Sequence, residues 1–231
     1  MLSIIIPVLN EERNLKKLIP LIYLNFKKNF EIIIVDDNSK DNTPKLIKIL
    51  KKKYKNIRLI IRKNKIKDLS LSCKIGFSRA KYNLILVMDG DGQHDVKNIN
   101  KILTLHQKND VTVGCRKFNS KQLKMGSLRK IFSLILIFLI NKFLGRKVSD
   151  PMSGFFIFNK KIYLQNKKFF YFHGFKILLN FLYRTKNLKI NECKINFLKR
   201  NNLKSKMNLK VLYYIIMFSI LTFFNKKFNE N

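Results

Sequence analysis

The sequence contains few of the residues that mark linkers, disulfide frameworks or cysteine-rich metal sites. Its 231 residues include 8 Gly, 4 Pro and 3 Cys. So little Gly and Pro excludes a collagen-like chain and a Pro/Gly-rich linker. The cysteines Cys73, Cys115 and Cys193 stand far apart. An odd number without CxxC spacing argues against a disulfide framework or a structural zinc site, so a reducing cytoplasmic compartment is the simplest interpretation.

Acidic residues are also scarce. Lys and Arg number 48 against 14 Asp and Glu, which gives a formal net charge of +34. Because 46% of the residues are hydrophobic, a disordered polycation is excluded, and the length favours one large domain or a domain with an appendage. The positive charge indicates an anionic partner, and nucleic acid, anionic lipid and phosphorylated small molecules all fit it.

Long apolar runs of the kind that cross membranes are missing, since a spanning helix needs about 20 apolar residues. The first apolar run is short, is interrupted by Pro7 and has no basic region before it, so we expect no signal peptide. Ile131–Ile140, with basic flanks, predicts either an interfacial helix or a buried core helix. Val211–Phe224 precedes Lys226 and Lys227 and predicts a segment that docks on a membrane or in an oligomer interface. We expect peripheral or shallow attachment to the cytoplasmic face of a membrane.

Short β-branched apolar runs alternate with segments of helical spacing along the first hundred residues. The runs, each typical of a buried strand, are Leu2–Ile6, Glu31–Val35, Ile57–Ile61 and Leu84–Met88. Helical spacing is seen at Leu15, Leu18, Ile19 and Ile22, and again at Leu46, Ile47, Leu50 and Tyr54. This alternation predicts an α/β fold with a mainly parallel sheet and helices on both faces.

The second half of the chain continues with fewer elements. Strands are predicted around Val111–Gly114, at Phe155–Phe158 and over the alternating residues Cys193, Ile195 and Phe197. A helix is predicted at about Phe175–Thr185. Ligands of parallel sheets bind beyond the carboxyl ends of the strands, so the polar residues at those ends are the candidate site.

Paired carboxylates follow the fourth predicted strand. Asp89 and Asp91 are two residues apart, and in an extended segment such residues point to the same side. Gly90 and Gly92 allow a tight bend there. Two carboxylates form a hard oxygen site suited to Mg²⁺ or Mn²⁺ and to bridging phosphate oxygens, although an ordinary polar turn is the alternative.

Acidic residues also follow the first two predicted strands. Asp36 and Asp37 are placed to accept hydrogen bonds from a base or a ribose, and Glu11 follows the first strand. The alternative is helix capping by Asn10, Asp36 or Asp37. Acidic residues thus follow three predicted strands, which is more than helix capping alone requires.

Five blocks of the sequence, in order, resemble the family 2 glycosyltransferases with a GT-A (Rossmann-like) fold: IIIPVLNEERNL, IIIVDDNSKDNT, LILVMDGDGQH, DPMSGFFIF and HGFKILLNFLYR. The most similar branch is the polyprenyl- and dolichyl-phosphate mannose synthases. The resemblance implies a GT-A catalytic domain over residues 1–207, with residues 128–148 as an interfacial helix. Residues 208–231 are then a short apolar and basic segment of C-terminal membrane-associated helices.

The resemblance also implies roles for individual residues. Those bordering the nucleotide are Pro7, Leu9, Glu11, Val35 and Asp37. The ligands of the Mg²⁺ or Mn²⁺ ion are Asp89, Asp91 and Gln93, with Gly90 contributing backbone. Basic residues of the donor and acceptor pocket are Arg116, Lys176, Arg200 and Lys206, and the catalytic group comprises Asp91, Arg116 and Lys176. The chain departs from the family pattern at three positions: Leu9 for Tyr, Leu203 for Gly and Asn180 for an acidic residue.

The implied reaction is the inverting transfer of a hexose from a nucleotide sugar, of the GDP-mannose or UDP-glucose type, to a polyprenyl phosphate. A phosphate monoester has a second pKa of about 6, so it is an ionised nucleophile at pH 7 and needs no general base. One alternative is a family 2 enzyme of cell-envelope glycan synthesis that uses a saccharide hydroxyl and needs a carboxylate base. An inactive relative is another.

A basic nucleic-acid-binding protein is the alternative from another class, but no helix-turn-helix or RRM pattern appears. The partners we expect are therefore the sugar nucleotide, polyprenyl phosphate and an anionic lipid surface, without nucleic acid. A homo-oligomer or a small membrane partner stays open.

Overall fold

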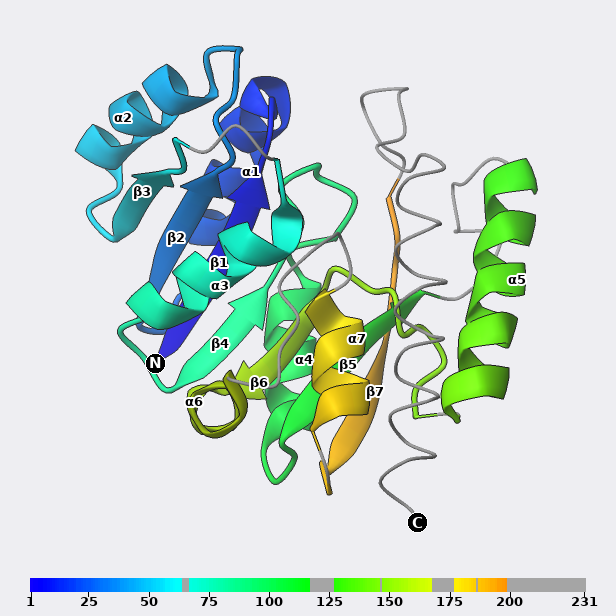
Figure 1. Cartoon of the computed structure of the whole chain (residues 1–231). Helices are drawn as coiled ribbons and strands as arrows, with labels where there is room; N and C mark the ends of the chain where they lie inside the picture. Colours follow the sequence, from blue (N-terminus) through cyan, green and yellow to red (C-terminus); the bar gives the residue numbers. More distant parts are fainter. Residues whose placement is uncertain (64–66, 117–126, 146, 168–176, 186, 199–231) are drawn as a thin grey trace.

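Seven strands form one sheet in the order β3-β2-β1-β4-β6-β5-β7 (Figure 1). The strands are β1 (Leu2–Val8), β2 (Phe30–Asp36), β3 (Ile57–Ile61), β4 (Leu84–Val87), β5 (Val111–Arg116), β6 (Phe156–Asn159) and β7 (Ile190–Ile195). The computed structural model describes residues 1–63, 67–116, 127–145, 147–167, 177–185 and 187–198. Within these, only the backbone is described for 127–130, 132, 143–144, 180 and 184.

The sheet is mainly parallel, as the alternation of elements predicts. β1 pairs in parallel with β2 and β4, β2 with β3, and β5 with β7. β6 is antiparallel to both of its neighbours, β4 and β5. The carboxyl ends of all strands except β6 therefore lie along one edge, where the first residues of β6 also lie.

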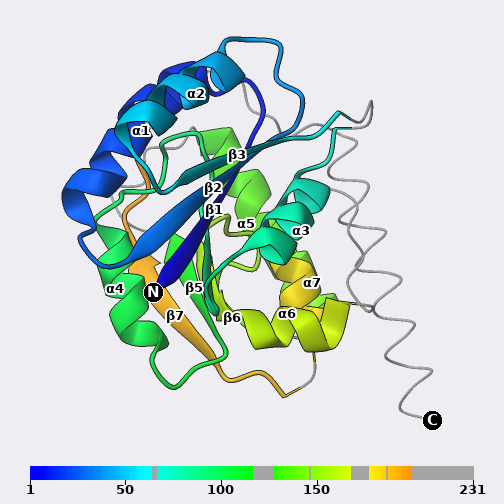
Figure 2. The same ribbon diagram turned by 90° about the vertical axis from the view of Figure 1, so that its left-hand side faces the viewer.

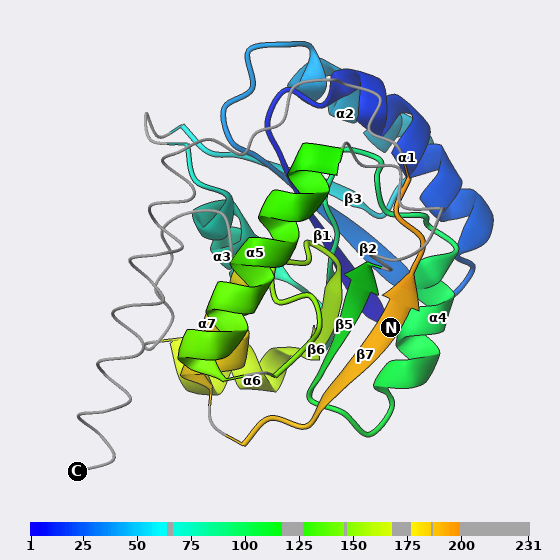
Figure 3. The ribbon, with the colours of Figure 1, turned by 90° about the vertical axis from the view of Figure 1, so that its right-hand side faces the viewer.

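Helices cover both faces of the sheet (Figure 2). On one face lie α1 (Glu12–Asn25), α2 (Thr43–Lys53) and α4 (Asn98–His106). On the other lie α3 (Leu69–Arg79), α6 (Lys160–Asn166) and α7 (Ile177–Arg184). Helix α5 (Ser127–Leu144) stands outside these layers, at the end of the sheet that carries β5 and β7 (Figure 3).

Alternating strand residues supply two separate apolar cores. Ile4 and Ile6 pack with α1, α2 and α4, whereas Ile5 between them packs against α3. This is expected for a strand buried on both faces, because successive side chains point in opposite directions. Cys73, Cys115 and Cys193 are buried free thiols within these cores, in accord with the absence of a disulfide framework.

β1 continues past the predicted end at Ile6, through Pro7 to Val8. Proline lacks an N–H donor and is normally excluded from central strands. Pro7 alternates with Ile5, whose carbonyl accepts from Met88 on the β4 side, and the β1–β4 ladder ends opposite Ile5. The N–H that Pro7 lacks would point towards β4, but the pairing of β1 with β4 has already ended at Ile5. No ladder hydrogen bond is therefore lost.

Helix α5 has one buried side and one exposed apolar side. Its inner side is buried at Leu136, Ile137 and Ile140, as in a core helix. Its outer side exposes a second apolar row, with exposed fractions of 41–63%, at Ile131, Leu134, Ile135 and Phe138. None of the helices within the described ranges is long and apolar enough to cross a membrane. The predicted C-terminal segment Val211–Phe224 lies outside the described residues.

Candidate active site

The ends of β1 and β2 are locked together by hydrogen bonds. Val8 lies opposite Asp36, and its carbonyl accepts from the Asp37 N–H at 2.9 Å. Asn10 has a φ of 55°, in the left-handed region that Asn tolerates, and its side chain accepts from the Lys40 N–H at 2.7 Å. Asn10 thus braces the neighbouring loop and does not cap α1, so the capping hypothesis was wrong for this residue.

Glu11 is buried at the end of β1, with 4% of its surface exposed. Its N–H donates to Thr43 Oγ1 at 3.0 Å, and its Oε2 accepts from Asn14 Nδ2 at 2.6 Å. Pro7 lies in β1 opposite Val35 of β2. The Val35 side chain belongs to the core on the α3 side, so any ligand contact of that residue is made through its backbone. Leu9 is half-buried in the turn that follows β1.

Asp37 belongs to a buried polar network rather than to a helix cap. Arg62 Nη1 donates to its Oδ1, and the Asp68 N–H donates to its Oδ2 at 2.6 Å. Burial raises the pKa of Asp37, and the positive charge of Arg62 opposes this rise without cancelling it. Arg62 Nη1 also donates to the Asp68 carbonyl at 2.9 Å, which ties the end of β3 to the start of α3. Asp37 is therefore held in place from two directions.

The Asp89–Gln93 turn follows β4 at the same edge. Gly92 has a φ of +74°, which permits the bend, and the Gln93 N–H donates to Asp91 Oδ1 at 3.1 Å. Gly90 packs so closely on Val8 that a β-carbon would approach it to 2.7 Å. The Asp89 side chain is 36% exposed and lies beside Gly154, where a β-carbon would overlap its carboxylate.

These residues fit a hard divalent cation. Both aspartates offer oxygen ligands, and the space at Gly154 that a β-carbon would fill is taken by the Asp89 carboxylate. The Gln93 side chain donates from Nε2 to the Leu198 carbonyl at 3.2 Å, so only its amide oxygen is suited to bind a metal. Over the described ranges, no three His, Cys, Asp or Glu side chains gather into a metal-binding group. Such a site is typical of ions that keep waters and bind substrate phosphates.

Arg116 ends β5 and forms a nearly buried ion pair with Asp150. Its Nε and Nη2 donate to the two carboxylate oxygens of Asp150 at 2.6 and 2.8 Å. Burial alone would lower the pKa of Arg116, but the charge of Asp150 outweighs it and the pKa is raised. The negative charge of Asp89 acts in the same direction, which indicates that the guanidinium lies near the Asp89–Gln93 turn.

The segment before β6 closes this corner of the site. Ser153 Oγ donates to the Gly114 carbonyl at 2.6 Å and accepts from the Phe155 N–H at 3.1 Å. The Gly114 N–H donates in turn to the Phe155 carbonyl at 2.8 Å. The strand end that carries Arg116 and the turn that carries Asp150 are thus one rigid unit.

The other predicted basic residues, Lys176, Arg200 and Lys206, lie outside the described residues, as does Leu203. Asn180 lies in α7, where only its backbone is described. The residues that sequence reasoning did not assign are the partners of the predicted ones: Arg62, Asp150 and Gly154. Two of these stand in the block DPMSG that carries the family resemblance, and Arg62 follows a predicted strand directly.

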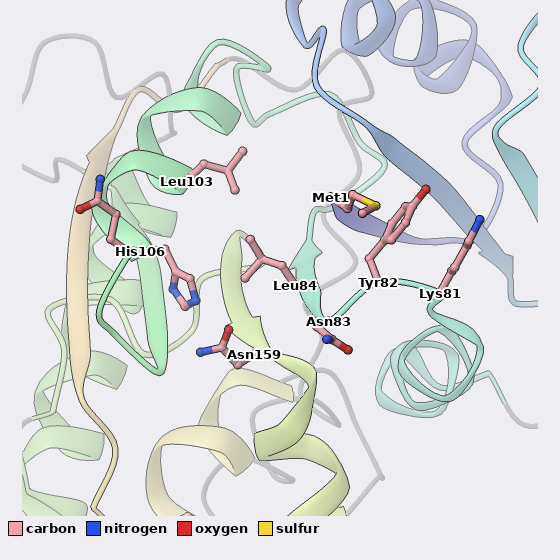
Figure 4. A pocket seen from close by; sticks show the side chains of 9 residues that line it. Met1, Lys81, Tyr82, Asn83, Leu84, Leu103, His106 and Asn159 are labelled. Carbon is pink, nitrogen blue, oxygen red and sulfur yellow. The ribbon is translucent and has the colours of Figure 1, made fainter.

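A hollow of about 460 Å³ lies at the opposite edge of the sheet (Figure 4). Its lining residues are Met1, Lys81, Tyr82, Asn83, Leu84, Leu103, His106, Gln107 and Asn159. None of these residues is acidic, so the hollow lacks the paired carboxylates of the candidate site. His106 is buried there and its Nδ1 lies 3.2 Å from Thr112 Oγ1.

Comparison with known proteins agrees with this arrangement. Dolichol-phosphate mannosyltransferase of Pyrococcus furiosus is 32% identical over 216 residues, which are 91% of this chain and 60% of that protein. Dolichol-phosphate mannosyltransferase of Saccharomyces cerevisiae is 30% identical over 226 residues, 91% of this chain and 82% of that protein. The chain thus spans less than two thirds of the archaeal relative.

Among solved structures, glucosyl-3-phosphoglycerate synthase from Mycobacterium tuberculosis, in complex with Mn²⁺, UDP-glucose and phosphoglyceric acid, is similar in fold. The TM-score is 0.71 at 14% identity, and the match covers 97% of this chain and 79% of that one. It supports a GT-A-like α/β fold. The model of the family described as Glycosyl transferase family 2 matches residues 3–165. By this match, the chain belongs to glycosyl transferase family 2.

Proposed function

We propose that this chain is an inverting glycosyltransferase that moves a hexose from a nucleotide sugar to a polyprenyl phosphate. The observation that carries the proposal is the pair Asp89 and Asp91 at the carboxyl edge of the sheet, with the Arg116–Asp150 ion pair beside it. The names of the relatives at about 30% identity support a lipid phosphate as acceptor.

The paired aspartates would hold Mg²⁺ or Mn²⁺, with the amide oxygen of Gln93 as a further ligand. When bound, such an ion supplies Lewis-acid stabilisation of a diphosphate leaving group. Glu11, Asp37 and the backbone around Pro7, Leu9, Val35 and Gly90 would border the nucleotide. Donation by Arg62 and by the Asp68 N–H would keep the Asp37 carboxylate in one orientation.

The reaction itself needs no strong base. An oxygen of the acceptor phosphate forms a bond to the anomeric carbon while the bond from that carbon to the donor diphosphate breaks. The electron pair leaves with the nucleoside diphosphate, and attack from the opposite face inverts the configuration. Because the acceptor is largely a dianion at pH 7, no proton has to be removed from it. Arg116, and Lys176, Arg200 and Lys206 beyond the described residues, would supply positive charge around the phosphates.

A saccharide hydroxyl as acceptor would require a carboxylate base. Four described carboxylates at this edge, apart from Asp89 and Asp91, accept hydrogen bonds from neighbouring residues. These pairs are Glu11 with Asn14, Asp36 with Ser39, Asp37 with Arg62 and Asp150 with Arg116. Because these four carboxylates already accept hydrogen bonds, we favour a phosphate over a saccharide hydroxyl as the acceptor. The net charge of +34 would also suit nucleic acid, but membership of glycosyl transferase family 2 favours the transferase function.

Helix α5 would bring the site to the lipid. Its exposed apolar row, Ile131, Leu134, Ile135 and Phe138, suits the head-group layer, and the positive net charge suits an anionic leaflet such as the cytoplasmic one. A polyprenyl phosphate could then reach the site without leaving the membrane surface.

The test is to incubate the full chain with Mn²⁺, polyprenyl phosphate and a panel of labelled sugar nucleotides that includes GDP-mannose and UDP-glucose. We expect one donor to give a labelled product that partitions into organic solvent and releases the sugar in mild acid. Failure of every donor, or label appearing only on added oligosaccharide, would overturn the proposal. The same panel identifies the donor and decides whether Leu9, Asn180 and Leu203 are compatible with activity.

A further inference from the structure

His94 is buried between Asp89, Phe155 and Phe197 at the candidate site. Only 3% of its surface is exposed. Its ring stacks on Phe155, with centroids 5.2 Å apart, and meets Phe197 edge-on at 5.5 Å. Its Nε2 lies 3.5 Å from Oδ2 of Asp89, the first residue of the metal-binding turn.

The polar atoms of this ring are otherwise unused. Neither ring nitrogen of His94 has a hydrogen-bond partner. A buried polar group without a partner is destabilising, so a phenylalanine would fill the same aromatic position at lower cost. Among the described residues, the carboxylate of Asp89 lies 3.5 Å from the ring, at Nε2. The His94 imidazole is therefore placed to contact the Asp89 carboxylate.

The aromatic stack continues to the cationic side of the site. The guanidinium of Arg116 lies over the Phe197 ring, 5.4 Å from its centroid. Backbone pairing fixes the same segment, because the Leu198 N–H donates to the Gln93 carbonyl at 2.8 Å and His94 forms a bridge with Phe197. Phe155, His94, Phe197 and Arg116 thus form one continuous stack beside the Asp89–Gln93 turn.

We propose that His94 is a positioning residue that orients the Asp89 carboxylate for the divalent cation. The inference rests on the proposed function, because it requires a cation at Asp89 and Asp91. The ring is clamped between Phe155 and Phe197, so its Nε2 is fixed in space. An imidazole nitrogen held 3.5 Å from Oδ2 limits the orientations that the Asp89 carboxylate can adopt. Groups that orient metal ligands in this way typically contribute 10–100-fold to metal affinity.

The test measures Mn²⁺ binding to the full chain by electron paramagnetic resonance, without any sugar nucleotide. We expect His94→Phe, which keeps the stack and removes the nitrogens, to weaken Mn²⁺ binding by at least about tenfold. We expect His94→Gln, which keeps an amide donor, to recover part of that loss. Binding by His94→Phe within about twofold of the wild type, or equal weakening in both variants, would overturn the proposal.

Two controls separate this role from general packing and from the proposed function. Phe77→Leu removes a buried aromatic ring whose ring contacts, to Phe158, Tyr163 and Phe181, lie outside the turn, and it should lower the melting temperature without changing Mn²⁺ affinity. A Phe77→Leu variant that loses Mn²⁺ affinity as His94→Phe does would show that packing alone explains the effect.

The second control is Asp91→Ala, which should abolish Mn²⁺ binding. Wild-type protein that binds no Mn²⁺ would overturn both proposals, whereas an unaffected His94→Phe beside a non-binding Asp91→Ala overturns this one alone.

Discussion

Gly154 lies so close to Asp89 that no β-carbon fits between residue 154 and the carboxylate. Gly154→Ala must therefore displace Asp89 or the turn before β6. We expect Mn²⁺ affinity and transfer activity to fall by at least about tenfold, because a metal ligand would leave its position. Titration of Mn²⁺ against the variant measures the first effect.

Gly145→Ala is the control for this substitution. Gly145 has a φ of +77°, so alanine there is strained by about 1–2 kcal/mol, but the added methyl group meets no atom within 4 Å. This variant should lose stability and keep its Mn²⁺ affinity. Equal Mn²⁺ affinities in wild-type protein and Gly154→Ala would contradict the assignment of Asp89 as a ligand.

The buried pair of Arg62 and Asp37 should be costly to break. Their side chains are 2% and 7% exposed, and removal of one partner from such a pair typically costs about 3–5 kcal/mol. Burial already raises the pKa of Asp37 in spite of Arg62, so the pKa should rise further in Arg62→Met. A carboxyl whose folded pKa exceeds its unfolded value loses stabilisation as the pH rises through the folded pKa.

Arg62→Met should therefore lose more stability at pH 7 than at pH 5, as measured by urea unfolding against the wild type. The double variant Arg62→Met/Asp37→Asn, which cannot ionise at residue 37, should recover part of the loss at pH 7. A deficit that is the same at both pH values and is not relieved by Asp37→Asn would show that the charge of Asp37 is not its cause.

His106 gives a second pH dependence of opposite sign. Burial lowers its pKa, against the smaller effects of Asn159 and Asp110, which raise it. The unfolded chain therefore binds the proton more readily than the folded one. The stabilisation is complete above the unfolded pKa of about 6.5 and is lost as the pH falls towards the lower folded value. We expect the free energy of unfolding to decrease between pH 7.5 and 5.5, and by less in His106→Gln; identical slopes for the two proteins would exclude His106 as the cause.

The central strands could be predicted from sequence because they are buried on both faces and read as continuous apolar runs, whereas β7 could be predicted from the alternation of Cys193, Ile195 and Phe197. The bounds of β3 match the prediction and those of the other strands differ by up to three residues, as at β1, where Pro7 stays in the strand. Helix α3 was not singled out because its buried residues include Ser70, Ser72 and Gly76, which do not form an apolar stripe. Small side chains suit that position, since a β-carbon at Gly76 would collide with Ile5.

Individual residues of the site could be predicted from the sequence, but the partners that they bind could not. Asp37, Asp89 and Arg116 were identified by their positions after strands and by family resemblance, and the structure places all three at one edge. Their partners could not be deduced, because Arg62 and Asp150 lie 25 and 34 residues from the groups they bind. These two pairs form because the strand order places β2 beside β3 and β5 beside β6.

The exposed row on α5 predicts lipid binding that depends on single side chains. Phe138 is 63% exposed, and insertion of such a side chain into an apolar phase is worth about 1.5–3 kcal/mol. Phe138→Ser should therefore weaken sedimentation with anionic vesicles at low salt by about tenfold or more. Ile49→Ser, at a 64% exposed position on α2, is the matched control and should bind as the wild type does. Equal binding by all three proteins would contradict a role for α5 at the membrane.

The most direct test of the central claim is transfer of labelled hexose to polyprenyl phosphate by Asp91→Ala at saturating Mn²⁺. Asp91 is half-buried and accepts from the Gln93 N–H within its own turn, so its removal should leave the circular dichroism spectrum and melting temperature close to those of the wild type. We predict that transfer falls by about a thousandfold or more, because the diphosphate would leave without its metal ion. A folded Asp91→Ala protein that transfers hexose at the wild-type rate would contradict the account.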